Sequence, residues 1–133
     1  MINKYLRDHP TIILRITLFV ILIMHSVPGM FDGGVNDFGK LYLNQIGFSP
    51  LGVPLAWLIK LSHLVTAFLL LADKYIQPAA IINIAIFITG IILIHFNEGW
   101  YVVGGGRNGI EFNVLLISVC LYLIVVDKKY QRQ

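Results

Sequence analysis

Four long apolar segments alternate with polar connections along the chain. They cover about residues 11–27, 52–72, 79–96 and 110–126. A helix needs about 20 apolar residues, with a lower limit near ~17, to cross the ~30 Å hydrocarbon core of a bilayer. A spanning β-barrel needs shorter segments of alternating polarity, and at least eight of them. The pattern therefore predicts an all-α fold, an integral membrane four-helix bundle that forms a single transmembrane domain over residues 1–133.

A short interfacial helix is predicted in the first outer loop, between the first two segments. Asn36 or Asp37 can cap its N-terminus, and Gly47, followed by Pro50, can end it. Its apolar residues fall on one helical face: Phe38, Leu41, Tyr42 and Ile46. We expect this helix to lie along the membrane surface, because an amphipathic segment places its apolar face at the headgroup boundary.

The composition supports a membrane protein and excludes several other classes. Apolar residues make up 57% of the chain and charged residues 13%, with a mean hydropathy of +0.78, whereas soluble domains have roughly 45–50% and 25%. The one cysteine, Cys120, cannot form an internal disulfide or a CxxC redox motif. The net charge is +3, but the basic residues are not interleaved with exposed aromatics, so no nucleic acid is expected as a partner.

The distribution of basic residues predicts the orientation of the helices. Lys and Arg in short loops remain on the cytoplasmic side. Six of the ten basic residues flank the expected inner ends of the segments: Lys4, Arg7, Lys74, Lys128, Lys129 and Arg132. The two longer loops contain only Lys40 and Arg107. We therefore expect a multi-pass protein of the cell (inner, cytoplasmic) membrane, with both termini in the cytoplasm and both long loops outside.

Ionisable residues within the apolar segments indicate a candidate ligand site. Lys60 and His63 lie on one helical face of the second segment, ~12 and ~16 Å below its outer end at 1.5 Å per residue. His25 and His95 lie near the outer ends of their segments, and Glu111 begins the fourth. Such groups are costly in a membrane and are usually functional. They predict an outward-facing polar pocket, with a Lys60–Glu111 ion pair.

Other residues are secondary candidates with competing structural interpretations. Arg15 lies near the inner end of its segment and can extend to lipid phosphates. Trp57 and Trp100 could line a ligand site, although tryptophans near membrane surfaces are typical of interfacial belts. His63 could equally hydrogen-bond to a neighbouring helix.

The chemistry of the expected pocket favours a quinone among the possible ligands. A quinone needs an apolar slot with one or two polar partners. Haem is disfavoured because no second matched histidine pair accompanies His25 and His95. A metal held by these histidines and Glu111 is disfavoured by their spacing, so no metal site is predicted. No common catalytic motif is present, and no catalytic residue can be assigned.

Two motifs resemble the DoxX family, the DoxX/DoxD-like four-span membrane proteins. They are "DFGKLYLNQIGFSPLGVPLAW" and "NEGWYVVGGGRNGIEFNVLLI", and with Arg15 and His25 the resemblance covers about residues 11–126. It points to Arg15, His25 and Glu111 as family residues. Many members carry a carboxylate in the second span, where the best-matching position here is His63.

The resemblance also implies a function. DoxD-like relatives are small subunits of a thiosulfate:quinone oxidoreductase, and DoxX relatives are associated with membrane complexes that handle oxidative or thiol stress. This implies a small, quinone-binding subunit of a redox-linked oxidoreductase complex, with the lipid bilayer and other membrane or redox subunits as partners. Two alternatives remain open: a non-catalytic membrane scaffold or assembly protein, and a small-solute carrier that acts as a homo-oligomer.

Overall fold

The structure is a computed structural model, and it describes residues 9–130. The described residues form helices and contain no strand, which confirms the predicted all-α class. The four long helices are α2 (Ile12–Phe31), α4 (Gly52–Leu71), α5 (Ile76–Gly90) and α6 (Glu111–Tyr130). The shorter elements are α3 (Gly34–Asp37), the π-helical η1 (Phe38–Phe48) and η2 (Ile91–His95), and the 3-10 helix η3 (Phe96–Glu98).

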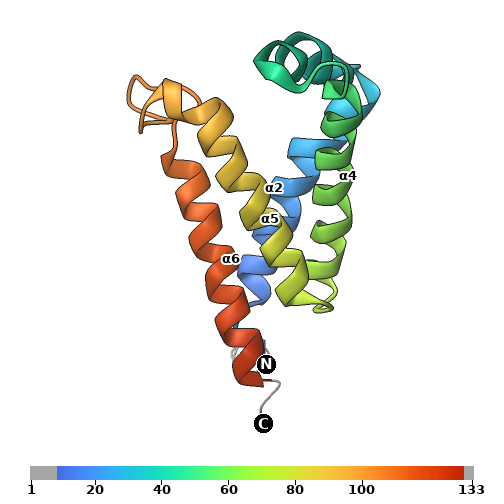
Figure 1. Cartoon of the computed structure of the whole chain (residues 1–133). Coiled ribbons are helices and arrows are strands. Elements are labelled where there is room, and N and C mark those ends of the chain that lie inside the picture. The colour runs from blue at the N-terminus through green and yellow to red at the C-terminus, as the bar shows by residue number, and fades with distance from the viewer. Residues whose placement is uncertain (1–8, 131–133) are drawn as a thin grey trace.

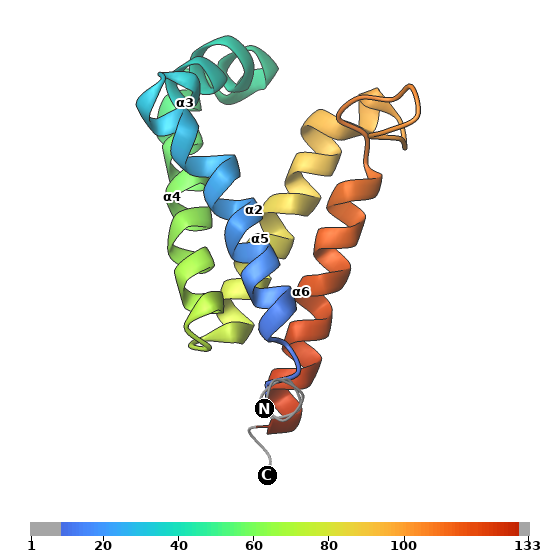
Figure 2. The ribbon, with the colours of Figure 1, turned by 180° about the vertical axis from the view of Figure 1, so that it is seen from behind.

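The long helices form two pairs that diverge like the arms of a V (Figures 1 and 2). One arm contains α2 packed against α4, and the other contains α5 packed against α6. A short turn joins α4 to α5 at the closed end of the V. The elements α3 and η1 lie at the open end, as does the loop that precedes α6 (Figure 1).

Within residues 9–130, three of the helices are long and apolar enough to cross a membrane. They are Ile12–Phe31, Gly52–Leu71 and Ile76–Glu98, with lengths of 20, 20 and 23 residues, the last comprising α5, η2 and η3. In α6, charged residues stand at both ends, and the uncharged stretch 112–126 would extend only ~22 Å as a helix. The structure thus shows a helical protein with three candidate spans, and a fourth span in α6 stays a prediction.

The main apolar core lies toward the closed end of the V. Small residues, among them Ala67, Ala79, Ala80 and Cys120, are completely buried there and pack with larger residues such as Leu70. Small side chains allow helix backbones to approach closely, which is how helices associate within a membrane. The outward faces of the same helices carry exposed apolar side chains, including Val20, Phe68, Ile88 and Leu121. Helices that are apolar on all sides are typical of a protein surrounded by lipid.

Glycines bring η1 against the start of α4 at the open end. A Cβ atom at Gly39 would clash with the backbone of Val53, and one at Gly52 would clash with the carbonyl oxygen of Gly39. The side-chain Oδ1 of Asn44 accepts a hydrogen bond from the backbone N–H of Gly52 at 2.9 Å, which satisfies one of the free amides at this helix start. The helix predicted in this loop is therefore present as η1 and is fixed to α4 by backbone contact, and its place along a membrane surface stays a prediction.

We expect Gly39→Ala to destabilise this junction. The new methyl group would overlap the backbone of α4, and overpacking of this kind costs about 1–3 kcal/mol. Thermal unfolding of the purified protein in detergent should therefore show a lower midpoint. Lys40→Ala is the matched control, because Lys40 is the next residue and is exposed. An unchanged midpoint for Gly39→Ala would contradict the close approach.

Candidate functional site

A cavity of about 830 Å³ lies between the two arms of the V. Its wall includes residues from all four long helices, from η1 and η2, and from the loop that precedes α6. Most of the wall is apolar, with Ile21, Leu55, Phe87 and Leu116 as examples. The volume is within the range of small-molecule sites, which usually combine an apolar wall with a few polar groups.

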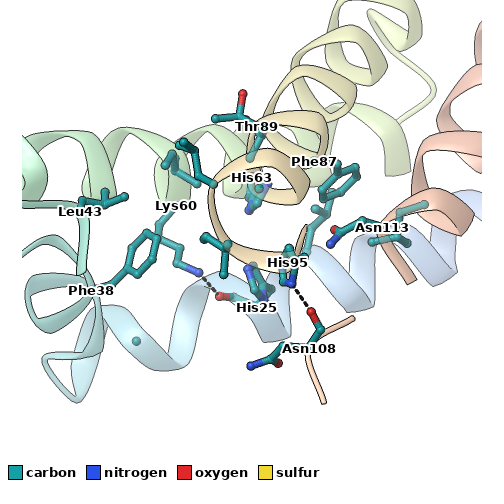
Figure 3. A pocket seen from close by; sticks show the side chains of 18 of the residues that line it. His25, Phe38, Leu43, Lys60, His63, Phe87, Thr89, His95, Asn108 and Asn113 are labelled. Atoms are coloured by element: carbon teal, nitrogen blue, oxygen red, sulfur yellow. Dashed lines mark hydrogen bonds between the residues drawn. The ribbon is translucent and has the colours of Figure 1, made fainter. Parts of the chain in front are cut away.

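Four nitrogen-bearing side chains of three helical elements meet in this cavity (Figure 3). They are His25 from α2, Lys60 and His63 from α4, and His95 from η2. The ring centroids of His25 and His63 are 5.7 Å apart. The predicted convergence of three of the main candidates, His25, Lys60 and His95, is thus present, and the secondary candidate His63 belongs to the same group.

Lys60 connects the two helices of its arm. Its Nζ donates a hydrogen bond to the backbone carbonyl oxygen of His25 at 2.8 Å. An ammonium group has three donor hydrogens, so this bond leaves further donors for a ligand. Lys60 therefore positions α2 against α4 and also offers a positive hydrogen-bond donor to the cavity.

In the cavity wall, His63 is a buried polar group whose side chain has no hydrogen-bond partner among the described residues. It is 2% exposed, and neither Nδ1 nor Nε2 makes a hydrogen bond. The ring of Phe87 lies beside it, with centroids 5.7 Å apart. An unmade hydrogen bond on a buried group costs free energy, and such exceptions in native structures call for an explanation. A ligand in the cavity would supply the missing partners.

His95 is oriented by the loop that precedes α6. Its Nδ1 lies 2.6 Å from the carbonyl oxygen of Asn108. A carbonyl can only accept, so Nδ1 carries the hydrogen, and Nε2 of the neutral ring is an acceptor. His95 is the last residue of the π-helical turn η2, and such turns occur frequently at functional sites.

Glu111 lies outside the cavity wall, and the predicted Lys60–Glu111 ion pair does not form. Its Oε1 accepts hydrogen bonds from the backbone N–H groups of Val102 and Val103, at 2.7 and 3.4 Å. The loop 99–110 folds back over the start of α6 and places these amides close to the carboxylate. The carboxylate therefore bonds to the loop and not to Lys60 in the arm formed by α2 and α4. Glu111 therefore organises the loop that holds Asn108.

The two tryptophans also lie outside the cavity wall. The indole Nε1 of Trp57 donates a hydrogen bond to the side-chain oxygen of Asn36 at 2.9 Å. Trp100 is 52% exposed, and its carbonyl oxygen accepts from the backbone N–H of Glu111 at 3.0 Å. Trp57 therefore connects α4 to α3, and Trp100 belongs to the loop that precedes α6.

Arg15 lies at the closed end of the V, far along α2 from the cavity. It is 3% exposed, and its guanidinium forms an ion pair with the carboxylate of Asp73 in the turn between α4 and α5. The expectation that Arg15 extends to lipid phosphates is therefore wrong. Asp73 has a left-handed backbone conformation, with φ of 59°, and this turn brings its carboxylate to the buried guanidinium.

Sequence reasoning missed several residues that shape the cavity. Phe87 carried no signal, because an aromatic residue in an apolar segment does not reveal which face it occupies. Asn113 did carry a signal as a polar residue in such a segment, and it lines the cavity at 9% exposure. Tyr42 was expected only on the apolar face of a surface helix. Its hydroxyl donates to the carbonyl oxygen of Leu93 at 2.8 Å and connects η1 to η2.

The carboxylates give the histidines no metal-binding partner. In the part of the chain that the structure describes, no three His, Cys, Asp or Glu side chains are grouped as ligands for a metal ion. Asp32 lines the cavity, but its Oδ1 accepts the backbone N–H of Gly34 at 2.8 Å. The arrangement is therefore suited to hydrogen bonding with an organic ligand.

Comparisons of the chain with protein-family models, with curated proteins and with solved structures found no match. The interpretation of the cavity therefore depends on its own geometry and chemistry. That geometry consists of a largely apolar wall, one amine and three imidazoles, of which the buried ring of His63 makes no hydrogen bond.

We expect Asp73→Asn to destabilise the protein without affecting the cavity. Asn tolerates the left-handed conformation, so the change removes the charge and leaves Arg15 buried without its counter-ion. Because Asp73 is 57% exposed, the loss should be about 1–2 kcal/mol, below the ~3–5 kcal/mol of a fully buried pair. Thermal unfolding of the purified protein measures this loss of stability.

A double-mutant cycle with Arg15→Leu separates the ion pair from other effects of Asp73→Asn. Asp73→Asn should cost less in the Arg15→Leu background, because no buried charge is left there without a partner. Lys74→Ala, an exposed change in the same turn, is the control. Equal effects of Asp73→Asn in both backgrounds would show that the pair adds nothing.

Proposed function

We propose that the protein is a four-span membrane protein of the DoxX type that binds a quinone in the cavity, as a small subunit of a redox-linked membrane complex. The observation that carries this proposal is the partnerless, buried His63 in the wall of an apolar cavity. The DoxX resemblance of the two sequence motifs supports the same function.

The packing of α6 supports a fourth span. One face of the helix contributes Leu116, Cys120 and Leu123 to the core, and the opposite face exposes apolar side chains such as Leu115 and Val125. Its 20 residues compare with the 23 of the candidate span Ile76–Glu98, and it lies beside α5 in both views (Figures 1 and 2). A helix that pairs with a candidate span and is apolar on both faces fits a bilayer better than water. A locally thinner bilayer can accommodate a short span.

The chemistry of a quinone matches the groups in the cavity. Its ring carbonyls accept hydrogen bonds, which Lys60 and an N–H group of His63 can donate. Its apolar tail needs a surface such as that formed by Ile21, Leu55 and Phe112. A carbonyl oxygen of the quinone would accept a hydrogen bond from His63, and a hydrogen bond made to a buried group favours binding.

A quinone site in this chain requires a separate redox partner. The chain contains one cysteine, Cys120, so it has no dithiol of its own to exchange electrons. Its residues can bind and orient the quinone, while another subunit of the complex exchanges electrons with it. Exposed apolar side chains on α5 and α6, such as Ile88 and Leu121, offer surfaces for such a subunit within the membrane.

The scaffold alternative has its own supporting observation. The Lys60–His25 and His95–Asn108 hydrogen bonds connect different elements of the fold, as expected if polar groups only hold helices together. This alternative does not account for His63, whose ring nitrogens make no hydrogen bond to the described residues. The effect of substituting His63 therefore distinguishes the two functions.

The proposed topology places loop 99–110 outside the cell and both termini in the cytoplasm. Single cysteines can be introduced by Arg107→Cys and Lys74→Cys, both at exposed positions, in a Cys120→Ala background. A membrane-impermeant maleimide should label the first in intact cells and the second only after the cells are opened. A tag at the C-terminus should be inaccessible to reagents outside intact cells. If the tag and position 107 were on the same side, α6 would not cross the membrane.

We expect the purified protein in lipid nanodiscs to bind decyl-ubiquinone, measured by equilibrium dialysis. His63→Leu removes both ring nitrogens and should weaken binding about tenfold, the effect of about one buried hydrogen bond. Ser118→Ala is the control, because the Ser118 hydroxyl is exposed on α6 and bonds within its own helix. Folded His63→Leu protein with wild-type affinity would contradict the site, and so would wild-type protein that binds no quinone.

A further inference from the structure

The histidines of the cavity present hydrogen-bond acceptors as well as donors. The clearest case is His95, whose Nδ1–H is used by the carbonyl oxygen of Asn108. Its other ring nitrogen, Nε2, is consequently an acceptor in the neutral imidazole. A ligand that approaches this nitrogen must bring a hydrogen of its own.

His63 presents a donor and an acceptor together. It is buried, and its side chain has no hydrogen-bond partner, so a positive charge on its ring would be desolvated without compensation, which is costly. In the neutral form one nitrogen carries a hydrogen and the other has a lone pair. Satisfying both nitrogens therefore takes a ligand that accepts at one and donates at the other.

The three imidazoles lie around one part of the cavity, where a single polar head group can meet them. Figure 3 shows His25, His63 and His95 near one another, with Lys60 beside them. The rings of His25 and His63 have centroids 5.7 Å apart, so both rings lie on the same part of the cavity wall. The three imidazoles and the amine thus form one cluster in a wall that is largely apolar.

The two redox forms of a quinone differ in how they can satisfy this cluster. The oxidised form has carbonyl oxygens, which only accept, so it leaves the acceptor nitrogens of His63 and His95 unpaired. The hydroquinone has hydroxyl groups, which donate and accept. Sites built to pair with a hydroxyl discriminate strongly against analogues that lack it, because buried polar groups are then left without partners.

We infer that the cavity binds the hydroquinone form, a neutral aromatic diol with an apolar tail, more tightly than the quinone form. This inference rests on the proposed function and adds to it the redox state of the ligand. Because the two binding steps are linked to the redox equilibrium, tighter binding of the hydroquinone shifts bound ligand toward the reduced form. The cavity is then a site that retains the reduced carrier.

The test compares decyl-ubiquinol with decyl-ubiquinone on the same nanodisc preparation under anaerobic conditions, by equilibrium dialysis. The hydroquinone should bind about tenfold more tightly in the wild type, since one additional buried acceptor is paired. His63→Leu should bring the two affinities close together. His63→Gln, which keeps one donor and one acceptor site, should retain part of the preference, and Ser118→Ala should retain all of it.

The outcomes separate this inference from the proposed function. If both forms bind equally, or the quinone binds more tightly, the preference is wrong and the quinone site stands. If neither form binds, the proposed function fails and the inference fails with it. If the preference persists in folded His63→Leu protein, then His63 is not its source. The wild-type affinity ratio decides the inference even if a variant does not fold.

Discussion

The close packing of the four long helices at one end of the bundle is the constraint on which the rest of the structure depends. Ala67, Ala79 and Ala80 are fully buried near the α4–α5 turn, and their small side chains let the helix backbones approach. The Arg15–Asp73 ion pair lies at the same end. Because the helices are held closely there, they diverge toward the other end, and the cavity is the space that this divergence leaves.

Hydrogen bonds hold the open end, where apolar packing is weaker. The hydroxyl of Tyr42 in η1 donates to the carbonyl oxygen of Leu93 in η2, and the carbonyl oxygen of Asn108 in loop 99–110 accepts from His95. The close approach of Gly39 to the backbone of α4 also fixes η1 at this end of the molecule. The open end is thus connected by polar contacts that involve few side chains, whereas apolar side chains pack the core at the closed end.

The sequence predicted the helices and the depth of most site residues along them, but not the hydrogen-bond and ion-pair partners of those residues. Counting residues along a helix places His25, Lys60 and His95 at similar depth, and the structure brings them together. The same count put Glu111 beside Lys60, yet the fold of loop 99–110 supplies nearer backbone amides. Arg15 was misinterpreted for a related reason, because its partner, Asp73, lies in a turn whose conformation the apolar pattern does not determine.

Half of the buried polar side-chain atoms without hydrogen bonds in the described residues belong to Arg15 and Asn83, whose side chains have another partner within the fold. Arg15 is paired with Asp73, and the amide nitrogen of Asn83 donates to the carbonyl of Ala79. The Ser26 hydroxyl is buried without a partner but is outside the cavity wall. Among these groups, His63 is the one that lines the cavity. A polar residue that only holds helices together needs a hydrogen-bond partner within the protein. His63 has none and lines a cavity large enough for a small molecule, so a ligand explains it better.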